Sequence, residues 1–153
     1  IGPQLRDVGP ESAGIDASLS KEVLKKQLLH LRDSEFDVGV IIEPEIGQVK
    51  TLHRLEAQIC VLSVDGFVRA RHGNEQSLEF NRLQDAANLA YSLGMRVGLR
   101  GAMELKHCNR LAEIGTIHEV HVGHSIIARS MLVGVSDALN RFREQFSHGR
   151  MRS

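Results

Sequence analysis

Short apolar runs alternate with longer amphipathic segments along this chain. The apolar runs cover Asp37–Ile42, Ala57–Val64, Met95–Leu99 and Ile117–Val122. A run that is apolar almost throughout is typical of a strand covered on both faces, as the strands of parallel sheets are. The alternation therefore predicts βα units built around about four parallel strands.

The segments around these runs carry apolar residues at helical spacing. In the first of them, Leu24, Leu28 and Leu31 recur on one face. Gly94 follows the longest segment, at a position where a glycine commonly ends a helix. The pattern predicts helices over Leu19–Arg32, Ile46–Leu55, Leu78–Leu93, Cys108–Ile114, His124–Leu132 and Val135–Phe146. We expect a loop over Asp7–Asp16 and a frayed tail over residues 148–153.

The repeating unit of strand, loop, helix and loop takes roughly thirty residues, the size of one step of a (β/α) barrel. A complete eight-stranded barrel needs at least about 200 residues, whereas this chain has 153. Residues 1–153 are therefore predicted to form one α/β domain that is about half of a TIM-type (β/α)8 barrel. The chain does not begin with Met, which suggests cleavage or an incomplete reading frame.

Composition removes several classes of partner. Nineteen Lys and Arg residues balance nineteen Asp and Glu residues, so the chain lacks the positive field that binding to nucleic acid or an anionic membrane needs. No apolar run approaches the length of a membrane span. The two cysteines, Cys60 and Cys108, are too few for a disulfide scaffold and lack CxxC spacing. We therefore expect a cytoplasmic protein with free thiols and no structural zinc.

The most informative stretch is Glu119–Val133, where a predicted strand runs through Gly123-His124 directly into a short helix. In (β/α) barrels, the loop after a late strand and the N-terminus of a short helix commonly bind phosphate. Gly123 would let the backbone approach the phosphate, and His124 would add a backbone N–H and a ring N–H. Alternatively, Gly123 is a simple turn and His124 a helix N-cap. The spacing alone does not decide between the two interpretations.

The same stretch, Gly123-His124-Ser125-Ile126-Ile127-Ala128-Arg129-Ser130, resembles the Gly-His-Ala/Ser-Ile-Ile-Gly/Ala-Arg-Ala segment of the pyridoxine 5′-phosphate synthase family. Gly14-Ile15-Asp16 resembles its Gly-Leu-Asp, and Ala90-Tyr91-Ser92-Leu93-Gly94-Met95-Arg96-Val97 resembles its Ala-Ala-Ser-Leu-Gly-Leu-Lys-Val. The resemblance begins partway along the family's chain. It implies the C-terminal half of a TIM-type barrel.

The resemblance also implies an activity. The family is a transferase of vitamin B6 biosynthesis that condenses 3-amino-2-oxopropyl phosphate with 1-deoxy-D-xylulose 5-phosphate, without a metal or an organic cofactor. It implies that Gly123 and His124 bind substrate phosphate, and that the backbone N–H of Ala102 contributes. A phosphorylated small molecule is therefore the expected partner.

The family's catalytic positions are changed in this chain. Gly101 stands at the position of the catalytic His, and Leu62 stands at the position of the catalytic Glu. Glu43 matches a terminal Asp only approximately, and the region of a substrate-contacting Thr holds Gly9 and Pro10. Each lost acid or base group usually costs about 10²–10⁴-fold in rate. Whether the chain is an enzyme stays open, the alternative being a non-catalytic paralogue that keeps a phosphate-binding or oligomerisation surface.

Other polar residues suggest weaker hypotheses. Arg100, Asp65 and Glu43 lie near predicted strand ends, where they could support new chemistry, although such charges are more often solvated or paired. Cys108 beside His107 suggests a thiolate, but a lone Cys on a short helix is more often buried packing.

Three histidines, His118, His121 and His124, share a spacing that suggests a metal site. Side chains alternate along a strand, so His121 should point away from the other two, and we expect no metal site. A half-barrel would leave edge strands and an apolar face exposed, which favours a homo-oligomer.

Overall fold

The computed structural model describes residues 14–150. Its sheet has four parallel strands in the order β1-β2-β3-β4, so each strand pairs with the next one along the chain. These strands are β1 (Gly39–Ile42), β2 (Ile59–Ser63), β3 (Arg96–Arg100) and β4 (Glu119–His121). The α/β fold with four parallel strands is confirmed, and the sequential strand order is that of successive barrel steps.

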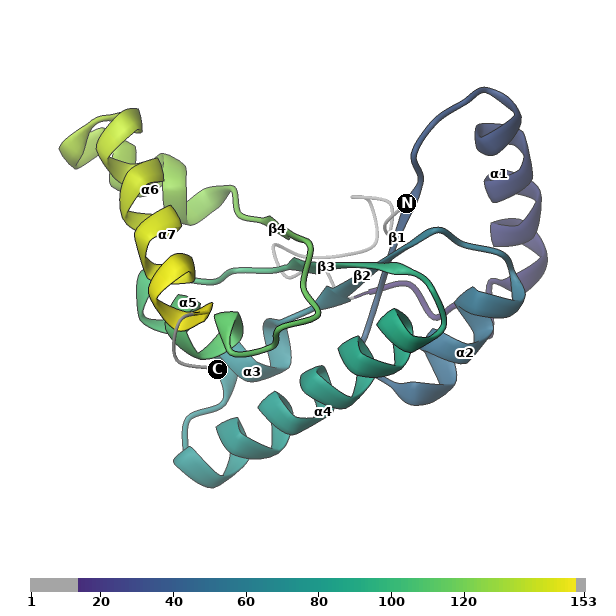
Figure 1. The fold of residues 1–153 in the computed structure, drawn as a ribbon, viewed down its shortest axis with the longest axis horizontal. Coiled ribbons are helices and arrows are strands. Elements are labelled where there is room, and N and C mark those ends of the chain that lie inside the picture. The colour runs from purple at the N-terminus through teal and green to yellow at the C-terminus, as the bar shows by residue number, and fades with distance from the viewer. Residues whose placement is uncertain (1–13, 151–153) are drawn as a thin grey trace.

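Helices precede, connect and follow the strands (Figure 1). They are α1 (Lys21–Asp33), α2 (Ile46–Arg54), α3 (Asp65–Arg69), α4 (Gly73–Ser92), α5 (Leu105–Ala112), α6 (His124–Val133) and α7 (Val135–Arg150). Helices α2 and α4 lie along one face of the sheet, and α5, α6 and α7 gather at its β4 end (Figure 1). Within residues 14–150, no helix combines the length and apolar character needed to cross a membrane.

Several predicted boundaries are wrong. Helix α3 was not predicted, because five residues are too few to show helical periodicity. Helix α4 begins at Gly73 rather than Leu78, since its first turn is exposed and carries no apolar stripe. Helix α5 begins at Leu105 rather than Cys108, and α7 continues to Arg150 rather than ending at Phe146. Residues 148–150 are therefore helical, and the rest of the predicted tail lies outside the described residues.

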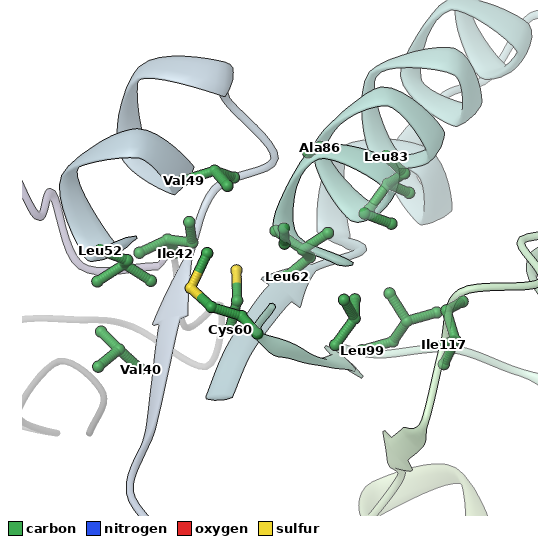
Figure 2. Close-up of a cluster of buried hydrophobic side chains, with 14 of the residues drawn as sticks. Val40, Ile42, Val49, Leu52, Cys60, Leu62, Leu83, Ala86, Leu99 and Ile117 are labelled. Carbon is green, nitrogen blue, oxygen red and sulfur yellow. The ribbon is translucent and has the colours of Figure 1, made fainter. Parts of the chain in front are cut away.

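The helix-facing side of the sheet forms the main core. In register across β1, β2 and β3 lie Val40, Cys60 and Val97, followed by Ile42, Leu62 and Leu99. Figure 2 shows members of this set packed with Val49 and Leu52 of α2 and with Leu83 and Ala86 of α4. Fully burying one such aliphatic side chain contributes about 1.5–3 kcal/mol, so these rows fix the helices on this face.

The alternate strand positions point to the opposite face, which we call the inner face. Ile59 and Val61 belong to it and are buried, yet lie outside the main core cluster. Towards the C-terminal ends of the strands the inner face becomes polar, with Ser63, Arg100 and His121 in register. In a (β/α) barrel this face is the interior of the barrel, and these ends border the active site.

The Gly14-Ile15-Asp16 motif has a structural role. A Cβ at Gly14 would overlap the backbone of Ile42 and Glu43, so only glycine fits this close approach. The Ile15 N–H donates to the carbonyl of Ile41 at 2.7 Å. This motif joins the entry to α1 to the end of β1. The predicted loop residues before it, including Gly9 and Pro10, lie outside the described residues.

Candidate functional site

A cavity of about 890 Å³ opens where β3 and β4 end and α6 begins. The residues singled out in the sequence that line it are Asp65, Arg100, Gly101, Ala102, His121, Gly123 and His124. They come from segments far apart in the sequence, and the parallel strands bring them to one end of the sheet. Active sites of (β/α) barrels lie at this end, so the cavity is the candidate site.

The N-terminus of α6 supplies the anion-binding element. Gly123 is the N-cap of α6 and His124 is its first residue, so the interpretation of His124 as the N-cap is wrong. The N–H groups of Ile126 and Ile127 both donate to the carbonyl of Gly123 at 3.1 Å. The first N–H groups of a helix have no intrahelical acceptor, and no acidic residue stands in this first turn. The positive end of α6 is therefore uncompensated beside the cavity.

Gly123 leaves the entrance to α6 open. A Cβ at this position would meet no atom within 4 Å. The glycine is therefore not required by packing, and a larger side chain would extend into open space beside the helix N-terminus. Ser125 anchors the same turn, because its hydroxyl donates to the carbonyl of Met103 at 2.7 Å.

Asp65 contacts the loop that follows β3 at Gly101 and Ala102. Gly101 has a φ of +154°, and a Cβ there would lie 2.6 Å from Asp65 Oδ1 and 2.8 Å from Val64 Cγ2. The N–H of Ala102 donates to the same Oδ1 at 3.2 Å. The predicted phosphate contact of Ala102 is thus engaged by a carboxylate, which would also repel an anion. Gly101 has no room for the side chain of a catalytic His.

Leu62 and Glu43, which the family resemblance also singled out, have structural roles. Leu62 is fully buried and belongs to the helix-facing core, so its side chain does not point into the cavity. Glu43 accepts the N–H of Gly14 at 2.9 Å and thereby ties the α1 entry to β1. Arg100 differs from both, because it lies at the cavity on the inner face beside Ser63 and His121.

Sequence reasoning missed a polar group on β4. His121 Nε2 lies 3.1 Å from Glu119 Oε1, and Glu119 Oε2 lies 3.6 Å from an Arg96 guanidinium nitrogen. Arg96 also pairs with Asp37 at 3.3 Å. These groups are partly exposed, so each pair contributes at most about 1 kcal/mol to stability. The polar–apolar–polar pattern of Glu119-Val120-His121 could have predicted this group, since it indicates a strand with one polar face.

The prediction that His121 points away from both His118 and His124 is wrong for His124. His121 and His124 line the same cavity, because β4 ends at His121 and the strand alternation does not continue to position 124. His118 lies elsewhere, with its ring centroid 5.8 Å from that of Tyr91 and its Nδ1 accepting the N–H of Val97. Among the described residues, no group of three His, Cys, Asp or Glu side chains is arranged to hold a metal ion.

The cysteines are core residues. Cys60 and Cys108 are both buried as free thiols, and burial raises the pKa of each to about 12. A thiol with such a pKa is almost fully protonated near neutral pH and is a poor nucleophile. The interpretation of Cys108 as buried packing is confirmed. His107, next to Cys108 in the sequence, accepts the N–H of Glu104 at 3.0 Å and forms a capping box at the start of α5.

Comparison with known proteins identifies the family. The family model described as "Pyridoxal phosphate biosynthesis protein PdxJ" matches residues 3–148. This chain belongs to the PdxJ family. Its relatives include proteins named pyridoxine 5′-phosphate synthase from Akkermansia muciniphila (31% identical over 93% of this chain), Geotalea uraniireducens (28% over 90%) and Coxiella burnetii (27% over 92%).

The match covers only part of each PdxJ relative. This chain spans 58% of the Akkermansia protein, 57% of the Geotalea protein and 59% of the Coxiella protein. Family membership confirms the resemblance carried by the Gly123–Ser130 segment, and the four parallel strands are consistent with a partial TIM-type barrel.

Proposed function

We propose that this chain acts in pyridoxal phosphate biosynthesis by holding the phosphate group of a small ketone at the N-terminus of α6. The observation that supports this function is the uncompensated helix terminus, with Gly123 and His124 lining a cavity at the C-terminal ends of the strands. A phosphate monoester carries up to two negative charges near neutral pH. It can accept hydrogen bonds from free N–H groups at a helix N-terminus, where the helix dipole also favours it.

The PdxJ relatives bear the name pyridoxine 5′-phosphate synthase. The proposed substrates are 3-amino-2-oxopropyl phosphate and 1-deoxy-D-xylulose 5-phosphate, which are both phosphorylated short ketones. The cavity of about 890 Å³ has the volume of a small-molecule site. We also propose that this chemistry uses no metal or organic cofactor. A cytoplasmic location and a homo-oligomer stay predictions.

The second candidate is a non-catalytic paralogue that keeps the phosphate site. The observation that favours it is Gly101, whose backbone conformation and contact with Asp65 leave no room for the family's catalytic side chain. Turnover separates the two candidates. Pyridoxine 5′-phosphate formed from the two ketones at a rate near that of a PdxJ relative would contradict the non-catalytic function, and no turnover with retained binding would support it.

Phosphate binding itself is tested by titration. We would follow 1-deoxy-D-xylulose 5-phosphate by phosphorus NMR against the wild type, Gly123→Val and His124→Ala. Gly123→Val should weaken binding by about tenfold or more, which corresponds to about 1.4 kcal/mol, because its side chain blocks the helix N–H groups.

Gly115→Val is the matched control, since a Cβ at Gly115 also meets nothing within 4 Å and Gly115 is not part of the cavity. Equal affinity of the wild type and Gly123→Val, or no binding by the wild type, would refute the proposed site. Weaker binding by Gly115→Val to the same extent would show that the loss at position 123 is not specific.

A further inference from the structure

We propose that His121 and Glu119 of β4 form a proton-transfer pair that acts on the carbon chain of the bound phosphorylated ketone. The inference rests on the proposed function for the position of the phosphate. Both residues line the same cavity as Gly123 and His124. Because β4 leads directly into α6 (Figure 1), a short ketone held by its phosphate at the α6 N-terminus extends over the inner face of this strand.

The geometry of the pair matches that of a base and its orienting carboxylate. Glu119 Oε1 lies 3.1 Å from His121 Nε2, which is a hydrogen-bond distance. The second carboxylate oxygen of Glu119 lies 3.6 Å from the guanidinium of Arg96, so the carboxylate is held from two sides. In known active sites, a carboxylate that hydrogen-bonds one ring nitrogen of a catalytic histidine holds the imidazole in one tautomer. Glu119 is placed to do this for His121.

Gly98 makes room for this arrangement. It lies opposite Glu119 in the register of β3 and β4. A Cβ at Gly98 would lie 3.2 Å from Glu119 Cγ and 3.3 Å from Oε1, closer than ordinary van der Waals contact. The missing side chain lets Glu119 lie across β3 towards Arg96. Gly98 and Arg96 of β3 therefore fit the position of the Glu119 side chain on β4.

The hydrogen bond assigns a role to each ring nitrogen. When Nε2 of neutral His121 donates to Glu119, Nδ1 carries the free electron pair. No described residue hydrogen-bonds Nδ1. Nδ1 can take the proton from the carbon next to the ketone, and the electron pair of the broken C–H bond moves to the carbonyl oxygen to form an enolate. Return of a proton to that carbon restores the ketone and the neutral imidazole, so the step balances.

Charged groups around His121 come from several elements. Arg100, its register partner on β3, brings positive charge to the same wall of the cavity, where an enolate oxygen would develop negative charge. The titratable and charged groups that face the pair or share the cavity are Glu119, Arg96, Arg100, Asp65, Arg69 and His124, with Asp37 reached through Arg96.

Isotope exchange tests the pair without requiring the complete reaction. We would incubate the protein with dihydroxyacetone phosphate in deuterium oxide and follow loss of the carbon-bound proton signal by proton NMR. The wild type should exchange the proton next to the ketone faster than buffer does. His121→Gln should slow this exchange by about 10²-fold or to the buffer rate, while phosphorus NMR of the same samples shows unchanged binding.

His30→Gln is the control, since His30 is exposed on α1 and lies outside the cavity. Binding without exchange above the buffer rate would overturn the inference and leave the proposed function standing. Equal exchange by His121→Gln and the wild type would do the same. If no phosphorylated ketone binds, the proposed function fails first and the inference fails with it.

Glu119 is a positioning residue in this proposal, and its test compares the exchange rate with binding. In Glu119→Gln the exchange rate at saturating dihydroxyacetone phosphate should fall by about tenfold or more, because a neutral amide no longer holds His121 in one tautomer. The affinity measured by phosphorus NMR should stay that of the wild type, and Glu119→Asp, which keeps a carboxylate, should recover part of the rate. An exchange rate in Glu119→Gln equal to that of the wild type would remove Glu119 from the pair.

Discussion

At the scale of single residues, the packing at positions 101 and 62 leaves no simple way to introduce the His and Glu side chains that the family resemblance implies there. Gly101 has a positive φ that side-chain-bearing residues rarely adopt, and its space is filled by Asp65 and Val64. Leu62 is a core residue whose side chain faces the helices. The packing around both positions therefore fits the residues that the chain has there.

Substitution of Gly101 should therefore cost stability. Gly101→Ala forces a Cβ to 2.6 Å from Asp65 Oδ1, and we expect a loss of about 1–3 kcal/mol in the free energy of unfolding from backbone strain and displacement of Asp65. Urea unfolding measures this change. Gly94→Ala is an informative control, because Gly94 shares a positive φ but its Cβ meets no atom within 4 Å. A smaller loss for Gly101→Ala than for Gly94→Ala would contradict the role given to Asp65.

Substitution of Leu62 by Glu, the residue that the family resemblance implies at this position, should destabilise the fold more than substitution of Gly101. The carboxylate would enter the apolar layer between the sheet and the helices. We expect destabilisation by about 3 kcal/mol or more, or loss of folding. Ser63→Glu provides the comparison, since position 63 belongs to the inner face. Equal or greater stability of Leu62→Glu relative to Ser63→Glu, measured by thermal unfolding, would show that the two faces are assigned the wrong way round.

At the scale of elements, the start of α5 links pH to stability. The imidazole of His107 is buried and accepts the N–H of Glu104. Burial, followed by repulsion from Lys106, lowers its pKa from the ordinary value. The folded state therefore favours the neutral ring, and protons bind the unfolded chain first as the pH falls. Stability from this site should be complete above the unfolded pKa of about 6.5 and decrease as the pH drops below it.

The measurement is the free energy of unfolding between pH 5 and pH 7.5, by denaturant titration. His107→Gln should flatten its dependence on pH, because Gln can fill the same capping position without titrating. His30→Gln, at an exposed site on α1, should leave the slope as in the wild type. An unchanged slope in His107→Gln would mean that other groups set the acid sensitivity.

Elements also show what sequence patterns can predict. The strands and the long helices were found because their apolar periodicity follows from local sequence. Helix α3 was missed because it is a single short turn, although its Phe67 packs 6.1 Å from the ring of Phe80. The Gly123-His124 corner was found as a local motif. The bond from Ala102 to Asp65 was not, because it joins residues separated by 37 positions.

At the scale of the whole molecule, one end of the described sheet is sparsely covered. Strand β4 pairs only with β3, and α6 has no buried residue. Met131 and Leu132 of α6 are 84% and 86% exposed. Exposed apolar patches beside an unpaired strand edge are typical of surfaces that associate. The predicted homo-oligomer is consistent with this surface.

Association through this surface can be measured by light scattering on the eluted protein. We expect the 153-residue polypeptide to have a mass above the monomer value of 17.0 kDa. Met131→Lys with Leu132→Lys should lower that mass by placing like charges on the surface. Leu19→Lys with Val23→Lys, at exposed apolar positions beside and in α1, should leave it unchanged. A monomeric wild type would contradict the prediction.

The lack of buried residues in α6 also bears on how tightly an anion can be held. A helix without a fully buried residue depends on its ends and on α7 to stay folded, so it belongs to the least stable part of a cooperative structure. Phosphate binding is then coupled to folding of the first turn of α6, because the bound ligand stabilises the folded form of that turn. The affinity observed would be the intrinsic affinity scaled by the population of that turn, and slower amide hydrogen exchange in α6 would report occupancy.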